Sequence, residues 1–285
     1  MDLNLASIAL GLVSAASWGA GDFSGGLASR RTNAFGVVIV SQAVGLLLML
    51  ALALALGEPV PTADSLAWAG ASGLAGGIGV TALYKALAMG QMGVAAPITA
   101  VLAAALPVLF ASITQGVPSV AHMIGFGLAL AGIWSLSRSE SSVERSQGLG
   151  LALLAGLGIG GFLILISQVG SAGPFWPLAS ARVASLLLIL TMVAFSRAFE
   201  PMRGTWRLVI LAGVFDIGGN LFFVLAAQAG RLDIAAVVSS LYPASTVLLA
   251  WLLLKERMTR LRVVGIVFVL VAIVLIAAPQ SWMLV

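Results

Sequence analysis

The chain has 285 residues, of which 61% are hydrophobic and 8% are charged, and its net charge is +4. A soluble domain of this length needs a far more polar surface, so the composition predicts an all-α protein that crosses a membrane many times. Without cysteine the chain can form no disulfide or thiolate metal site. His122, the one histidine, cannot build a metal cluster alone, and we expect it at the membrane interface. We expect no metal and no cofactor.

Apolar runs of about 20 residues between polar breaks predict ten transmembrane helices. The first run follows no basic segment or cleavage pattern typical of a signal peptide, so we expect it to be retained. The runs cover residues 5–28, 35–56, 66–88, 93–115, 119–137, 148–170, 174–196, 205–228, 233–254 and 261–279.

A polar linker at residues 138–147 separates two halves, 1–137 and 148–285. A shift of 140 residues places Gly73 on Gly213 and Gly79 on Gly219 without a gap. In the first half the basic loop follows span 1, whereas in the second half the basic loops follow spans 7 and 9. Because each half holds an odd number of spans, the second copy would enter the membrane upside down. We therefore predict two inverted-topology repeats of five helices.

The loops after the odd-numbered spans hold every Lys and Arg of the loops except Arg231. Positively charged loops of membrane proteins stay in the cytoplasm. We therefore expect the linker in the cytoplasm, both termini outside, and a location in a bacterial-type inner membrane. Because orientation explains these charges, they do not indicate a nucleic-acid partner.

Four ionisable residues lie within the predicted spans: Asp22, Lys85, Arg182 and Asp216. An ionisable group at the bilayer centre costs about 2.5–3.5 kcal/mol, so each is a candidate functional residue. Asp22 and Lys85 lie near the cytoplasmic ends of spans 1 and 3, and we expect them to form a structural pair. Arg182 and Asp216 lie deeper. They either pair in the same way or face a central cavity, where they bind substrate or exchange a proton.

Spans 1, 3, 6 and 8 combine glycines with polar and aromatic side chains, which favours a cavity wall over tight packing alone. Trp18 is placed in the cavity, where its ring could stack on an aromatic or cationic solute. A position facing lipid or the core is the alternative. Pro107 and Pro243 are expected to act as hinges near the midplane. The predicted cavity residues are Trp18, Tyr84, Arg182, Asp216, Asn220, Ser239 and Tyr242, and the coupling candidates are Asp216 and Asp22.

The last two apolar runs form a hairpin that carries Pro243, then Glu256 between two basic residues, then Gly265. With Trp18 in span 1, this pattern resembles the EamA-type transporters of the drug/metabolite transporter superfamily over essentially the whole chain. The resemblance implies two repeats around a central cavity that opens alternately to the two faces without ATP. It also implies export of small metabolites, with amino acids prominent among them. Gly116 stands in the first copy where Glu256 stands in the second, so a strictly symmetric mechanism is not expected.

We therefore expect an exporter of small metabolites, above all amino acids, that lies in the lipid bilayer and could work as a monomer. Aromatic amino acids are favoured because aromatic side chains lie on the presumed cavity spans. An alternative is a proton-coupled exporter of lipophilic cationic drugs, which needs an unpaired carboxylate such as Asp22 or Asp216. An intramembrane enzyme fits less well, because His122 stands alone and the two aspartates are expected at different depths.

Overall fold

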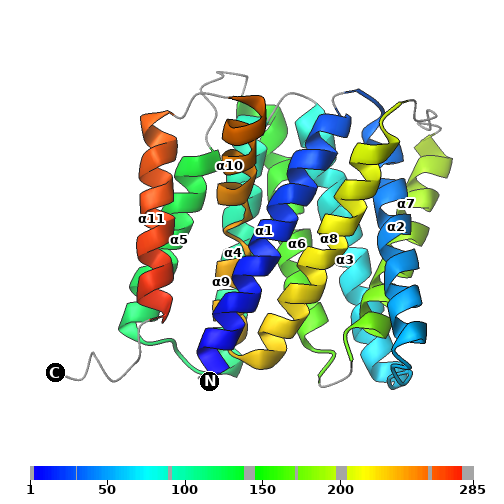
Figure 1. The fold of residues 1–285 in the computed structure, drawn as a ribbon, viewed down its shortest axis with the longest axis horizontal. Coiled ribbons are helices and arrows are strands. Elements are labelled where there is room, and N and C mark those ends of the chain that lie inside the picture. Colours follow the sequence, from blue (N-terminus) through cyan, green and yellow to red (C-terminus); the bar gives the residue numbers. More distant parts are fainter. Residues whose placement is uncertain are drawn as a thin grey trace.

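The computed structural model describes residues 3–29, 31–88, 92–137, 145–170, 173–196, 204–255 and 259–277, and within these ranges all regular structure is helical. Figure 1 shows the helices standing side by side as one bundle. The first half holds α1 (Leu3–Ser29), α2 (Ala34–Ala55), α3 (Ala63–Ala88), α4 (Met92–Thr114) and α5 (Val120–Ser137). The second half holds α6 (Arg145–Ser167), α7 (Phe175–Ser196), α8 (Trp206–Ala229), α9 (Leu232–Ser239), α10 (Tyr242–Leu254) and α11 (Arg260–Ala277).

Many of these helices are built to cross a membrane. Within the described ranges, six helical segments are long and apolar enough to do so, and two more apolar helices are shorter. The six are Phe35–Ala55, Ala63–Leu83, Gly148–Ser167, Phe175–Phe195, Trp206–Ala229 and Leu232–Leu254; the shorter two are Ile98–Thr114 and Val120–Leu136. The all-helical, multi-pass character predicted from composition is therefore confirmed.

Local chemistry sets where the helices begin and end. The side chain of Asn33 accepts a hydrogen bond from the backbone N–H of Phe35 at 2.8 Å and thereby caps the start of α2. Gly57 and Gly116 follow the ends of α2 and α4 with φ of 64° and 86°. Residues with a Cβ rarely adopt this left-handed conformation, so glycine stops both helices.

The span predicted at 233–254 is divided into two helices, which corrects the expectation of one continuous helix. α9 ends at Ser239, residues 240–241 form a turn, and α10 begins at Tyr242 with Pro243 in its first turn. Proline lacks an N–H and fits the first turn of a helix, whereas inside a helix it removes a hydrogen bond and clashes with the preceding turn. The chain therefore stops and restarts at this proline. By contrast, α4 continues through Pro107 without a break.

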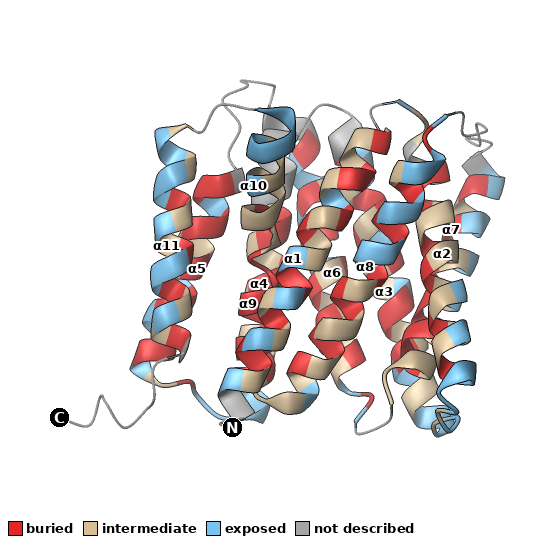
Figure 2. Cartoon of the chain, viewed as in Figure 1, coloured by how far each residue is buried: buried red, intermediate tan, exposed pale blue. Residues whose placement is uncertain are grey.

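The two halves are interleaved. α1 packs on α8, and α3 packs on α6; α2 packs on α7, α5 on α11, and α4 on α6 and α9. A shift of 140 residues exchanges α1 with α6 and α3 with α8, so each of these pairings corresponds to another or to itself. Small residues allow the closest approaches: a Cβ on Gly158 would lie 2.6 Å from the Cα of Gly79. Buried residues face the interior of the bundle and exposed ones its periphery (Figure 2).

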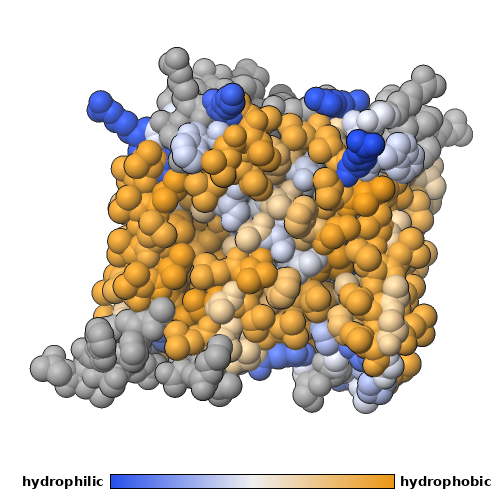
Figure 3. Space-filling model, viewed as in Figure 1, coloured by the Kyte–Doolittle hydropathy of each residue, from blue (hydrophilic) through white to orange (hydrophobic). Residues whose placement is uncertain are grey.

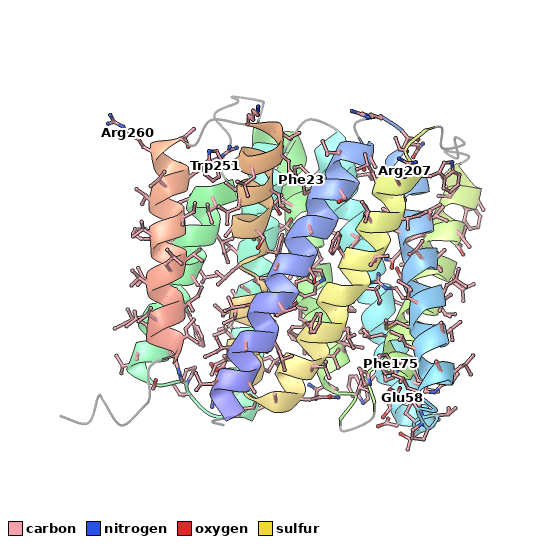
Figure 4. The ribbon with its side chains drawn as sticks, viewed as in Figure 1. Phe23, Glu58, Phe175, Arg207, Trp251 and Arg260 are labelled. Atoms are coloured by element: carbon pink, nitrogen blue, oxygen red, sulfur yellow. The ribbon has the colours of Figure 1, made fainter. Side chains whose placement is uncertain are left out.

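The periphery is an apolar belt with polar ends (Figure 3). Arg207 and Arg260 lie at one end of the bundle, and Glu58 and Phe175 lie at the other (Figure 4). We call the end that carries Arg207 and Arg260 the basic face and the end that carries Glu58 the opposite face. α1 starts at the opposite face and ends at the basic face (Figure 1).

Candidate functional site

A cavity lies between the two halves and is lined by residues of α1, α2, α3, α4, α6, α7, α8 and the α9–α10 break. Its empty space measures about 1080 Å³, which includes open space at its mouth. Asp22 near the end of α1, Val38 near the start of α2 and Leu83 near the end of α3 all line it. These helix ends lie at the basic face, so the cavity extends from the middle of the bundle toward that face.

An ion pair sits at the centre of the cavity wall. Arg182 of α7 donates from Nη2 to Oδ2 of Asp216 on α8 at 2.5 Å, and from Nη1 to Oε1 of Gln42 on α2. The Nε2 of Gln42 in turn donates to the hydroxyl of Ser185 at 3.1 Å. The side chain of Arg182 is 9% exposed and that of Asp216 is 40% exposed. The guanidinium group is therefore held behind the carboxylate, and the carboxylate faces the cavity.

Asp22 is the second carboxylate of the cavity wall, and it is exposed. Among the described residues it forms no ion pair, and Lys85 is exposed on α3. The expected Asp22–Lys85 pair is therefore wrong. Lys85 can extend its long side chain toward the water at the end of α3 and needs no partner within the bundle. The ionisable wall residues Asp22, Arg182 and Asp216 sum to a formal charge of −1.

Aromatic rings surround the inner part of the site. Trp18 stacks on Phe223 with a centroid distance of 5.9 Å and meets Tyr242 edge-on at 6.3 Å. Gly219 of α8 makes room for the indole ring, because a Cβ there would lie 2.6 Å from Nε1 of Trp18. The ring is thus held between α1, α8 and α10, and Trp18 and Tyr242 both line the cavity.

Neutral polar groups complete the wall. Asn220 lines the cavity, is 5% exposed, and forms no hydrogen bond with any other described residue. A buried amide without a partner is costly, so Asn220 is ready to bind a solute or water. Ser240 lines the cavity at the α9–α10 break. Ser239 was the residue predicted to do so, but it is the last residue of α9, is fully buried, and faces Gly11 of α1.

The cavity has two chemically different walls. The wall formed by α1, α8 and α10 carries Trp18, Asp22, Asp216, Asn220 and Tyr242. A shift of 140 residues places the wall formed by α6, α3 and α4 opposite it. The corresponding residues there are Gly158, Phe162, Gly76, Val80 and Leu102, all without charge or polar side-chain atoms. One wall of the site is therefore polar and the other apolar, although the helices themselves correspond.

The bundle is closed at the opposite face by polar clasps between the halves. Arg231, between α8 and α9, donates to the carboxylate of Asp233 at 2.7 Å and to the carbonyl oxygens of Gln115 and Gly116 at 3.1 and 2.8 Å. The carboxylate of Glu58 accepts from the backbone N–H of Trp176 at 2.9 Å. The first clasp joins the end of α4 to the start of α9, and the second joins the end of α2 to the start of α7.

Several predicted residues lie elsewhere. The side chain of Tyr84 and all of Glu256 lie outside the described parts of the structure. His122 is 2% exposed and lies against α11, with Nε2 at 3.2 Å from the carbonyl oxygen of Ile276. The expectation that it faces the membrane interface is therefore wrong, because the helix carrying it packs along α11. Among the described residues, no three His, Cys, Asp or Glu side chains gather as a metal site would require.

Sequence reasoning missed Gln42, which holds Arg182. Glutamine within an apolar run has no formal charge and was overlooked beside the four ionisable residues. The repeat offered a signal, because a shift of 140 residues places Gln42 on Arg182. Glu58 and Arg231 were seen only as loop charges, and nothing in the sequence linked them to the start of α7 or the end of α4.

The interleaved halves, the apolar belt and the polar cavity define a helical membrane protein with a site enclosed between two repeats. The chain matches the EamA-like transporter family over residues 5–138 and 146–278, and it belongs to that family. The predicted family is therefore confirmed, and the protein is a membrane transporter rather than a member of an enzyme family.

Two further similarities are informative about size and fold. The chain is 26% identical over 130 residues to the uncharacterized protein MJ1333.1 of Methanocaldococcus jannaschii, across 45% of this chain and 93% of that protein. That relative therefore corresponds in length to about half of this chain. A crystal structure described only as that of a protein matches with a TM-score of 0.74 at 18% identity, covering 95% of this chain and 96% of the other. This likeness concerns the fold.

Proposed function

We propose that this protein exports small metabolites from the cytoplasm, most of all amino acids, by alternating access through the central cavity and without ATP. The observation that carries the proposal is a polar cavity between two halves, extended toward the basic face and closed by clasps at the opposite face. A transporter that alternates between two openings must pass through such a one-sided state. No Gly-x4-Gly-Lys-Ser/Thr pattern occurs in the chain, which fits gradient-driven or facilitated transport.

The proposed topology is ten spans in two inverted repeats, residues 1–137 and 148–285, joined by a linker at 138–147. The exchange of α1–α8 with α3–α6 under the repeat shift supports it. The basic face is then cytoplasmic, and both termini lie outside an inner membrane. Because both repeats are in one chain, a monomer is sufficient.

The proposed substrates are amino acids with aromatic side chains. Trp18 and Tyr242 on one wall and Phe162 on the other offer rings on which an aromatic side chain can stack. Asp22 and Asp216 can accept hydrogen bonds from an ammonium group, or exchange a proton as coupling residues. The alternative of a lipophilic cation is favoured by one observation, which is that Asp22 forms no ion pair with a described residue.

The test is counterflow in proteoliposomes that are preloaded with one unlabelled amino acid and then given labelled phenylalanine outside. We expect aromatic amino acids inside to accelerate uptake, and Trp18→Ala to abolish the acceleration. Trp251→Ala is the matched control, because Trp251 is 47% exposed on the periphery of α10 (Figure 4). Equal loss in both variants, or no counterflow with any amino acid, would contradict the proposal. Uptake of a lipophilic cation under a proton gradient in that case would favour the alternative.

A further inference from the structure

The polar wall of the cavity offers a free anion but no free cation. Arg182 is its only basic residue, and the guanidinium group is shared between Asp216 and Gln42. Its side chain is 9% exposed, whereas Asp216 is 40% exposed and Asp22 is exposed without an ion pair among the described residues. A solute in the cavity therefore meets carboxylates first.

We propose that the cavity selects its substrate by a protonated primary amine, that Asp22 is the group that binds this amine, and that Arg182 does not serve as a receptor for carboxylate. This inference rests on the proposed transport function and specifies its substrate class. The preferred substrate carries an ammonium group at one end, an apolar or aromatic body at the other, and a net positive charge.

A substrate carboxylate has no comparable partner. To reach Arg182 it must displace Asp216 from a charge-assisted hydrogen bond of 2.5 Å, and it approaches two carboxylates in a site with a formal charge of −1. The remaining donors facing the cavity are neutral, such as the amide of Asn220 and the hydroxyl of Tyr242. Neutral donors bind an anion more weakly than a free guanidinium does. A zwitterionic amino acid is thus bound through its ammonium group, and removing its carboxylate improves the fit.

The two walls explain where the rest of the substrate goes. Asp22 lies on α1, four residues from Trp18, so the two side chains share one face of that helix. A cation near Asp22 can also contact the face of the indole ring. The apolar body extends toward α6 and α3, where Phe162, Gly76 and Gly77 line the cavity. Asn220 has no partner among the described residues and can bind a polar substituent between the two ends.

The experiment varies only the charge of one ring system. External 2-phenylethylamine, phenylalanine methyl ester, phenylalanine and 3-phenylpropionate compete with counterflow of labelled phenylalanine, and each is also tested for thermal stabilisation of the purified protein in detergent. We expect the two cations to compete at concentrations about tenfold lower than phenylalanine, and 3-phenylpropionate not to compete. In Asp22→Asn the advantage of the cations should be lost, a change of about tenfold or more.

Asp216→Asn gives the opposite test, because it removes the partner of Arg182. We expect phenylalanine and 3-phenylpropionate to bind more tightly to that variant. Asp64→Asn, at an exposed residue in the first turn of α3, is the matched control and should leave the series unchanged. Preference of the wild type for phenylalanine or 3-phenylpropionate over the amines, or an amine preference that survives Asp22→Asn, would overturn the inference.

Failure of the transport function gives a different pattern. If no compound moves faster than in protein-free liposomes, the proposed function is wrong. The detergent measurement still decides the inference, because stabilisation by the amines that is lost in Asp22→Asn supports it. Absence of stabilisation by any amine overturns it.

Discussion

The clasp around Arg231 should hold the opposite face closed, and Arg231→Met should weaken that closure. Arg231 is 27% exposed, whereas its partner Asp233 is fully buried. The change removes the ion pair and the hydrogen bonds to the carbonyl oxygens of Gln115 and Gly116 at the end of α4. Removing one partner of a buried pair costs about 3–5 kcal/mol, because the other charge stays buried. Since Arg231 is partly exposed, we take about 2 kcal/mol as the loss to the closed state.

A state in which the opposite face is open does not make this clasp and loses nothing. The ratio of closed to open molecules should therefore fall about 30-fold, since 1.4 kcal/mol corresponds to a factor of ten. The chain has no cysteine, so Ser240→Cys introduces a unique thiol into the cavity. A membrane-impermeant maleimide applied from the opposite face should label it about 30-fold faster in the Arg231→Met background. Arg207→Met, on the basic face, is the control (Figure 4).

A second variant separates closure from folding. Asp233→Asn added to Arg231→Met removes the unpaired buried charge and should restore part of the slow labelling. Unchanged labelling from the opposite face in Arg231→Met, together with reduced thermal stability, would show that the clasp only stabilises the fold and would refute this reasoning.

Two other substitutions test close contacts of the site and of the second clasp. Gly219→Ala should displace the Trp18 ring, because its Cβ would lie 2.6 Å from Nε1, and should lower the affinity for aromatic substrates in counterflow about tenfold; Gly127→Ala, with no atom within 4 Å of the added Cβ, should not. Glu58→Gln should lower thermal stability in detergent by about 1 kcal/mol, because the charge at the start of α7 is lost while the hydrogen bond to the N–H of Trp176 can persist. An unchanged substrate affinity in the first case, or unchanged stability in the second, would contradict these contacts.

The helices could be predicted from the sequence because the membrane imposes one rule on all of them. A run of about 20 apolar residues has to satisfy its backbone internally, so it forms a helix. The runs at 35–56 and 174–196 accordingly became α2 and α7 within a residue or two. The break at Ser240 could not be predicted in the same way. Proline in a membrane helix either kinks it or starts a new one, and the choice depends on what neighbouring helices offer to the freed carbonyl groups.

Charge inside the spans was informative, but its partners were not. Arg182 and Asp216 were recognised because ionisable residues are expensive in a bilayer. The wrong pairing of Asp22 with Lys85 arose because depth along the chain says nothing about the direction in which a side chain points. Gln42 was missed because a neutral amide is inexpensive enough to be overlooked, although it decides how Arg182 is held. Contacts of this kind depend on the packing of α2 against α7, which periodicity alone does not give.

The repeat explains both the strength and the limit of this prediction. Duplication copies what the bilayer demands, namely helix lengths, small contact residues and pairings, so these features recur in both halves. The site is different, because a solute with two chemically distinct ends cannot be bound by two identical walls. Asp22 corresponds to Phe162 and Asp216 to Gly76, and in each case the polar residue lies on the same wall. The positions where the two halves disagree are therefore those that face the substrate.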